Sequence, residues 1–94
     1  MKALMAPDAQ FVLISEVRNR LIEEGCAMKG ALVWQPIVVR NGGKARMAVY
    51  GDHFEVRPLK APGRTWRSGP NPRPETLVRA CLRAVDEDAA YRKR

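Results

Sequence analysis

The side chains that could do covalent chemistry are few in this chain, and none stands in a catalytic pattern. Ser15 falls inside a segment with helical periodicity and Ser68 inside a loop, and neither has the glycine pattern of a nucleophile elbow. Cys26 and Cys81 are far apart in the sequence and have no motif around them, so we expect reduced, packed thiols. These residues predict a protein that is not an enzyme.

The single histidine, His53, is the remaining candidate for acid–base or metal chemistry. It follows a turn signal at Gly51 and Asp52, where a solvated residue at the end of a strand is the simpler interpretation. One histidine and two distant cysteines do not have the spacing of a zinc site. We therefore expect no metal and no cofactor, and a small nuclease that uses His53 is only the third functional hypothesis.

Positive charge gives the clearest functional signal. The chain of 94 residues has a formal net charge of +7, and residues 32–74 hold eight lysines and arginines against two carboxylates. Such a concentration favours an anionic partner, either nucleic acid or an acidic protein surface, although a basic charge also keeps a small protein soluble. The residues that we expect to bind the partner are Arg40, Lys44, Arg46, Arg57, Lys60, Arg64, Trp66, Arg67 and Arg73.

Four of these cations surround Trp66 in the stretch KAPGRTWRSGPNPRP, which contains four prolines and no acid. Residues 60–73 therefore predict a long basic loop rich in proline and glycine. Ordinary connections are shorter, so a loop of this length tends to be functional or mobile. Its tryptophan is either exposed, where it could stack on a base, or buried as an anchor of the loop.

Two segments have the apolar periodicity of helices. They flank the basic region of residues 32–74 and would pack against it. In residues 8–24 the apolar positions include Leu13, Ile14, Val17 and Leu21, with Phe11 and Ile22 widening the stripe. We expect Asp8 as the N-cap and Gly25 just after the C-terminus. The second helix begins at Pro74 and has its apolar face at Leu77, Val78, Cys81, Leu82 and Val85, and residues 92–94 form a frayed basic tail.

Three segments between the helices predict strands. Residues 32–39 are rich in β-branched and aromatic residues, and Pro36 places that strand at an edge or a bulge, where Trp34 seals the core. Residues 45–50 and 53–59 alternate between apolar and polar side chains. Asn41–Lys44 and Gly51–Asp52 supply the two tight turns of an antiparallel meander.

The order of these segments predicts one α+β domain over residues 1–94, with a helix, a three-stranded antiparallel meander and a second helix (αβββα). Both helices would pack on one face of the sheet, because amphipathic elements must cover its apolar side, and one helix on each face is the variant. No apolar run is long enough for a membrane helix, and we expect a cytoplasmic protein that does not bind membranes. The oligomeric state is left open, with a homodimer as one option.

The two helical segments carry a family resemblance. The stretches PETLVRACLRAV and APDAQFVLISEVRNRLIEEG resemble the closing and opening helices of small phage and prophage proteins of the ABA-sandwich kind. This resemblance implies a phage accessory protein in a bacterial host cell and implies no catalytic residue.

Two main functional hypotheses follow. The first is a non-enzymatic accessory protein that binds nucleic acid or a nucleoprotein complex through a basic sheet and loop surface. The second is a protein–protein inhibitor or adaptor, a phage product that acts on a host machine and is anchored by Trp66 and the arginines around it.

Overall fold

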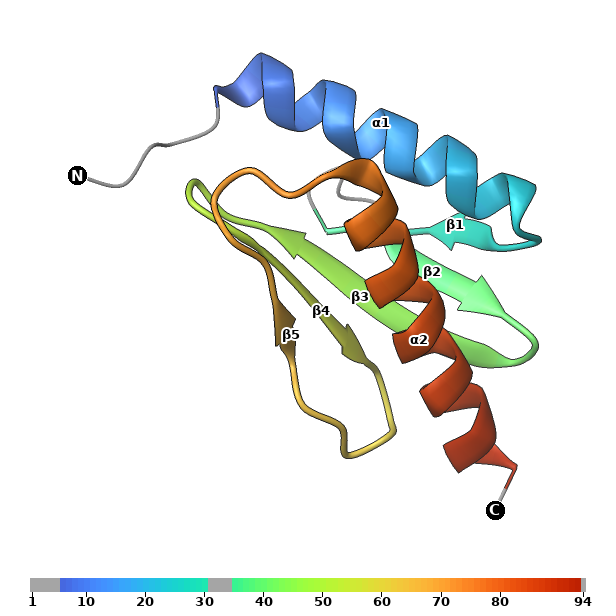
Figure 1. Cartoon of the computed structure of the whole chain (residues 1–94). Helices are drawn as coiled ribbons and strands as arrows, with labels where there is room; N and C mark the ends of the chain where they lie inside the picture. Colours follow the sequence, from blue (N-terminus) through green and yellow to red (C-terminus); the bar gives the residue numbers. More distant parts are fainter. Residues whose placement is uncertain (1–5, 31–34, 94) are drawn as a thin grey trace.

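The fold is an α+β arrangement in which two helices cover one face of a five-stranded sheet (Figure 1). The computed structural model describes residues 6–30 and 35–93. Its elements, in chain order, are α1 (Pro7–Glu23), β1 (Ala27–Lys29), β2 (Ile37–Arg40), β3 (Gly43–Val49), β4 (Phe54–Pro58), β5 (Trp66–Arg67) and α2 (Pro74–Arg92).

Both predicted helices are confirmed, with small differences at their ends. α1 begins at Pro7, so Ala6 rather than Asp8 is the N-cap, because proline fits the first helical position where its missing N–H is not needed. Gly25 adopts a φ of +87° just beyond the helix, as expected for a helix C-terminus. The predicted stripe of α1 was too wide, since Phe11 and Ile22 are 52% and 49% exposed.

The sheet is an antiparallel meander, but it has two more strands than the sequence predicted. Its order is β1-β2-β3-β4-β5, which makes the short strands β1 and β5 the edges. β1 lies between the predicted helix of residues 8–24 and the predicted strand of residues 32–39, where no strand was expected, and β5 lies inside the predicted basic loop. Each of these two strands is identified by its pairing with the adjacent strand. Two or three residues show too little periodicity to predict a strand from the sequence.

The strand predicted at 32–39 is β2, and it is shorter and more central than expected. It begins at Ile37 and pairs with β1 and β3, so it is not an edge strand. Pro36 avoids the ladder by preceding the strand, and its carbonyl oxygen accepts a hydrogen bond from the Met47 amide at 3.1 Å. Trp34, which we expected on this strand, lies outside the described residues.

The predicted turn between β2 and β3 is confirmed. Asn41 and Gly42 have φ values of +52° and +82°, the pair of positive angles that a two-residue type I′ hairpin requires. The second predicted turn joins β3 to β4, where the Tyr50 amide donates to the His53 carbonyl oxygen at 2.9 Å.

The core lies between the sheet and both helices, as the two amphipathic patterns predicted. Alternate residues of β3 and β4 point toward the helices and are buried, while the residues between them point the other way. The fully buried side chains of this core include Val17, Leu21, Val38, Met47, Phe54, Val56, Leu77, Cys81 and Val85.

One buried carboxylate joins α2 to the sheet. Asp88 is fully buried and accepts hydrogen bonds from the backbone amides of Lys44 (2.8 Å), Lys60 (2.6 Å) and Ala61 (2.9 Å). Arg92 donates to the same carboxylate at 2.5 Å, so Arg92 is the last residue of α2 rather than part of a frayed tail. Asp88 therefore holds the β2–β3 hairpin and the segment after β4 against one helix.

The backbone of β3 passes unusually close to α2 at Gly43. A Cβ atom at this position would lie 2.1 Å from the Val85 carbonyl oxygen and 2.6 Å from the Ala89 amide nitrogen. No side chain fits in that space, so the glycine is required by the approach of the hairpin to the helix.

Candidate nucleic-acid interface

One face of the sheet is covered by neither helix, and we call it the open face. Strand register places on it Ala27, Lys29, Ile37, Val39, Lys44, Arg46, Ala48, Glu55, Arg57 and Arg67. Five of these ten residues are cations and only Glu55 is acidic. The alternation of β3 and β4 produces this face directly, because the residues between the buried ones must point away from the core.

Two arginines lie directly opposite each other at the centre of the open face. Arg46 of β3 pairs in register with Arg57 of β4. Like charges in this position repel each other and weaken a sheet. Within residues 6–30 and 35–93, no carboxylate forms an ion pair with either arginine. Their charge is therefore available to an external anion.

The same row continues to the edge of the sheet. Register aligns Lys29 of β1 with Ile37 of β2, and Ile37 with Arg46. Sequence reasoning missed Lys29, because the connector in which it lies gave no sign of a strand. The row of Lys29, Arg46 and Arg57 runs across four strands and crosses the strand direction.

A pocket of about 240 Å³ lies on the open face at the arginine pair. Arg46, Arg57, Tyr50, Glu55, Ala48, Gln35 and Thr65 line it. Two guanidinium groups at one pocket favour an anionic group such as a phosphate, since arginine presents several donors in a planar fork.

The single acid of the open face is bound by the histidine beside it. His53 Nε2 lies 2.8 Å from Glu55, and His53 Nδ1 lies 2.7 Å from Asp52. The ring of Tyr50 stacks on the imidazole, with 4.7 Å between the ring centroids. The His53 side chain is only 10% exposed, so the expectation of a solvated strand-end residue was wrong.

This cluster has a chemical consequence for the open face. Both ring nitrogens of His53 are engaged by carboxylates, so neither is directed at a substrate in the pocket. The contact with His53 also occupies a carboxylate oxygen of Glu55, the one acid on this face. The spacing of residues 53 and 55, which share one side of a strand, is the sequence signal that could have identified the pair.

The other predicted cations divide by position. Lys44 and Arg67 lie on the open face, and both are exposed. Lys60, Arg64 and Arg73 are also exposed, but they lie in the segments that flank β5 rather than in the sheet.

Unlike the other predicted cations that belong to strands, Arg40 lies away from the open face. Its guanidinium group binds Asp86 of α2 through two contacts of 2.8 and 2.9 Å and donates to the Glu24 carbonyl oxygen at 3.3 Å. Arg40 therefore serves the contact between β2 and the helices, and we leave it out of the interface.

Trp66 is partly buried and packs against the core, on the same side of the sheet as its register partner Val56. The alternative of a fully exposed indole is therefore excluded. Part of the ring still lines a second cavity, at the β5 edge of the sheet.

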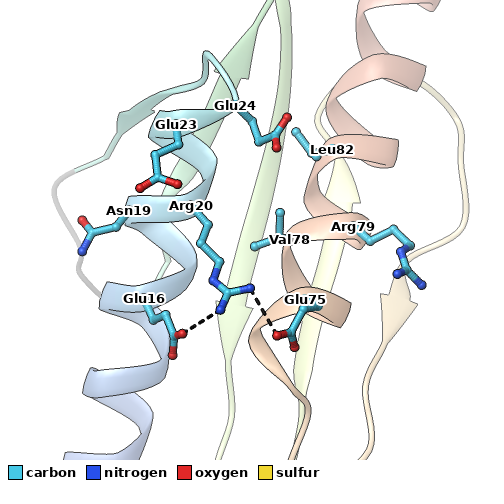
Figure 2. A pocket seen from close by; sticks show the side chains of 9 residues that line it. All are labelled: Glu16, Asn19, Arg20, Glu23, Glu24, Glu75, Val78, Arg79 and Leu82. Atoms are coloured by element: carbon cyan, nitrogen blue, oxygen red, sulfur yellow. Dashed lines mark hydrogen bonds and ion pairs between the residues drawn. The ribbon is translucent and has the colours of Figure 1, made fainter.

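The helices form a groove with the opposite charge. Figure 2 shows Arg20 between two acids in the groove between α1 and α2, at 3.0 Å from Glu16 and 3.2 Å from Glu75. Glu23 and Glu24 line the same groove of about 850 Å³. Four carboxylates against two arginines, Arg20 and Arg79, give the groove a net negative charge that would repel a polyanion.

The two cysteine side chains are buried, away from both the open face and solvent. Cys26 and Cys81 are buried free thiols, as expected, and burial raises the pKa of Cys81 to about 12. The described residues contain no group of His, Cys, Asp and Glu that could hold a metal ion. No helix in the described part of the chain is long and apolar enough to cross a membrane.

Comparisons with protein-family models, with curated proteins and with solved structures give no match for this chain.

Proposed function

We propose that this protein binds nucleic acid through the open face of its sheet, chiefly by contacts to phosphates. The observation that carries the proposal is the opposed pair Arg46 and Arg57, which has no carboxylate partner in the described residues. Two like charges side by side weaken the sheet, so a bound polyanion is the partner that would relieve the repulsion.

The distribution of carboxylates over the rest of the molecule also favours binding at the open face. Seven of the ten carboxylates of the chain belong to α1 and α2, whereas the sheet and its turns contribute only Asp52 and Glu55. A nucleic acid would therefore be attracted to the open face and repelled from the groove between the helices.

The sequence left a protein–protein inhibitor or adaptor as the alternative, anchored by Trp66 and the arginines around it. The partial burial of Trp66 gives it less support. A phage-type accessory protein that acts in the bacterial cytoplasm stays a prediction.

Fluorescence anisotropy with a labelled oligonucleotide over a series of salt concentrations tests the proposal. We expect binding that weakens with salt, because bound phosphates release counterions. Arg46→Ala and Arg57→Ala should each reduce the magnitude of the slope of log K against log salt, by about 0.9 for each lost phosphate contact on a duplex and by about 0.7 on a single strand.

The matched controls remove the same charge from the helices. Arg18 and Arg79 are exposed on α1 and α2, so Arg18→Ala and Arg79→Ala change the net charge equally. These variants should bind almost as the parent does. Binding that ignores salt, or an equal loss in the helix variants, would contradict the proposal.

A further inference from the structure

We propose that the cavity at the β5 edge of the sheet holds an unpaired nucleobase, so that the ligand of the open face is single-stranded nucleic acid. The inference rests on the proposed function. It concerns a cavity of about 420 Å³ between β5, the segment before it and α2, which is within the size range of small-ligand sites.

Hydrogen bonds fix both ends of the segment that joins β4 to β5 and borders the cavity. The start of the segment between β4 and β5 is attached to Asp88 through the amides of Lys60 and Ala61. Its end is attached to β4, because the Ser68 amide donates to the Phe54 carbonyl oxygen at 2.9 Å and the Phe54 amide donates to Ser68 Oγ at 2.8 Å.

α2 leaves the space between these points unfilled. Two of its four residues at the cavity, Ala80 and Ala84, lie one turn apart and have only methyl side chains. The segment therefore spans a preformed hollow, and a ligand would not have to order the chain in order to bind.

The lining suits a planar ring that carries phosphates. Trp66, Val56 and Pro58 supply apolar walls, and Arg64, Arg67 and Arg83 place three cations around them. The one carboxylate in the lining is Glu87, which lies 3.8 Å from Arg83. An aromatic wall with surrounding arginines is the combination by which proteins bind bases and their backbone together.

Arg67 connects this cavity with the open face. It lines the cavity, and its register with Glu55 places it on the open face as well. A strand bound at Arg46 and Arg57 could therefore continue over the edge of the sheet and insert a base beside Trp66. A duplex could not do this without unstacking, because its bases are enclosed by pairing and stacking.

The decisive experiment compares two ligands on the unaltered protein. One is a short labelled oligothymidylate, and the other has the same length and phosphates but abasic sugars. We expect the abasic strand to bind about tenfold more weakly, within the range measured for loss of one base–aromatic stack. Equal affinities for the two strands would overturn the inference but leave the proposed function standing. If neither strand bound in a salt-dependent way, both the inference and the proposed function would be overturned.

Variants locate the effect at the cavity. Arg83→Ala should weaken binding of the base-bearing strand by about threefold, on the scale of one lost cation contact. Arg79→Ala, one turn away on the same helix but facing the other groove, should not. Equal effects of these two variants would contradict the assignment.

The tryptophan gives a second readout. Trp66→Phe keeps an aromatic wall and the core contact, so it should retain most of the preference for the base-bearing strand, whereas Trp66→Ala should abolish it. Far-UV circular dichroism establishes that each variant is folded. A folded Trp66→Ala variant that keeps the full preference would exclude Trp66 as the stacking surface.

Discussion

Three arginines that lie on α1 and α2 or contact them donate hydrogen bonds to carboxylates, whereas Arg46 and Arg57 on the open face have no carboxylate partner among the described residues. Arg20 bridges Glu16 and Glu75, and Arg40 binds Asp86. Arg92 binds Asp88, one turn away on α2. On the open face the one acid, Glu55, is bound by His53 instead of by an arginine.

This difference separates stability from binding. A charge that already has a partner contributes to the fold, and its removal should be detected as a change in the free energy of unfolding. An arginine that lies opposite another arginine does not stabilise the fold by its charge. Its removal should be detected in the affinity for an anion. Substitutions on the two sides of the molecule should therefore have opposite effects.

The largest loss of stability should follow from Asp88→Ala. Burial alone would raise the pKa of Asp88, but hydrogen bonds from Arg92 and from three backbone amides outweigh it and hold the pKa well below its ordinary value. Removal of the carboxylate leaves those buried donors without an acceptor and should lower the free energy of unfolding by about 3–5 kcal/mol in urea denaturation.

The same carboxylate should make the protein sensitive to acid. The unfolded chain takes up a proton at Asp88 near pH 4, roughly the ordinary value, while the folded protein does so only at lower pH. The stabilisation is therefore complete above about pH 4 and is lost as the pH falls below it. In Asp88→Ala this part of the pH dependence should disappear, and a variant with an unchanged acid transition would contradict the assignment.

Gly43→Ala should have the next largest effect, a loss of about 3 kcal/mol, because the new methyl group would collide with the backbone of α2. Gly42→Ala is the control, since no atom lies within 4 Å of the added carbon there. Its only cost should be the left-handed φ of +82°, about 1 kcal/mol. Thermal denaturation of the two variants would show the difference, and equal losses would mean that the hairpin can move away from the helix.

Arg40→Ala should lower the free energy of unfolding by about 1 kcal/mol, because it breaks an ion pair in which the arginine is 21% and the carboxylate 55% exposed. The affinity for nucleic acid and its salt slope should be unchanged. A salt slope lowered as much as in Arg46→Ala would place Arg40 in the interface, as the sequence suggested.

The smallest effect has the opposite sign. Arg57→Thr removes one of the two facing charges and introduces a residue that strands favour. It should raise the free energy of unfolding by about 0.5 kcal/mol and at the same time weaken binding of nucleic acid. Urea denaturation and anisotropy on the same sample would test both parts, and a destabilised variant would show that Arg57 supports the sheet.

The parts of the fold that the sequence predicted depend on local patterns. The helices follow from apolar periodicity together with Pro74 and Gly25, and β3 and β4 follow from alternation, which also placed Arg46 and Arg57 on one face. β1 and β5 could not be predicted, because each is only two or three residues long and exists through its partner strand.

The candidate site was predictable to the same extent. The partner of Arg40 lies 46 residues away on another element, so no local pattern reveals that its charge is used. The inward direction of Trp66 likewise depends on the pairing of β5 with β4. Long-range contacts of this kind determine which members of a basic cluster are free to bind.

Asp88 also has a consequence for the motions of the protein. The amides of Lys44 and Lys60 belong to two segments that are separate in the sequence, yet both donate to this one carboxylate. Neither amide can exchange its hydrogen with solvent until the bond to Asp88 opens. Their exchange rates should therefore report one common opening of the C-terminal part of α2. The β2–β3 hairpin and the wall of the β5 cavity would then form a single cooperative unit.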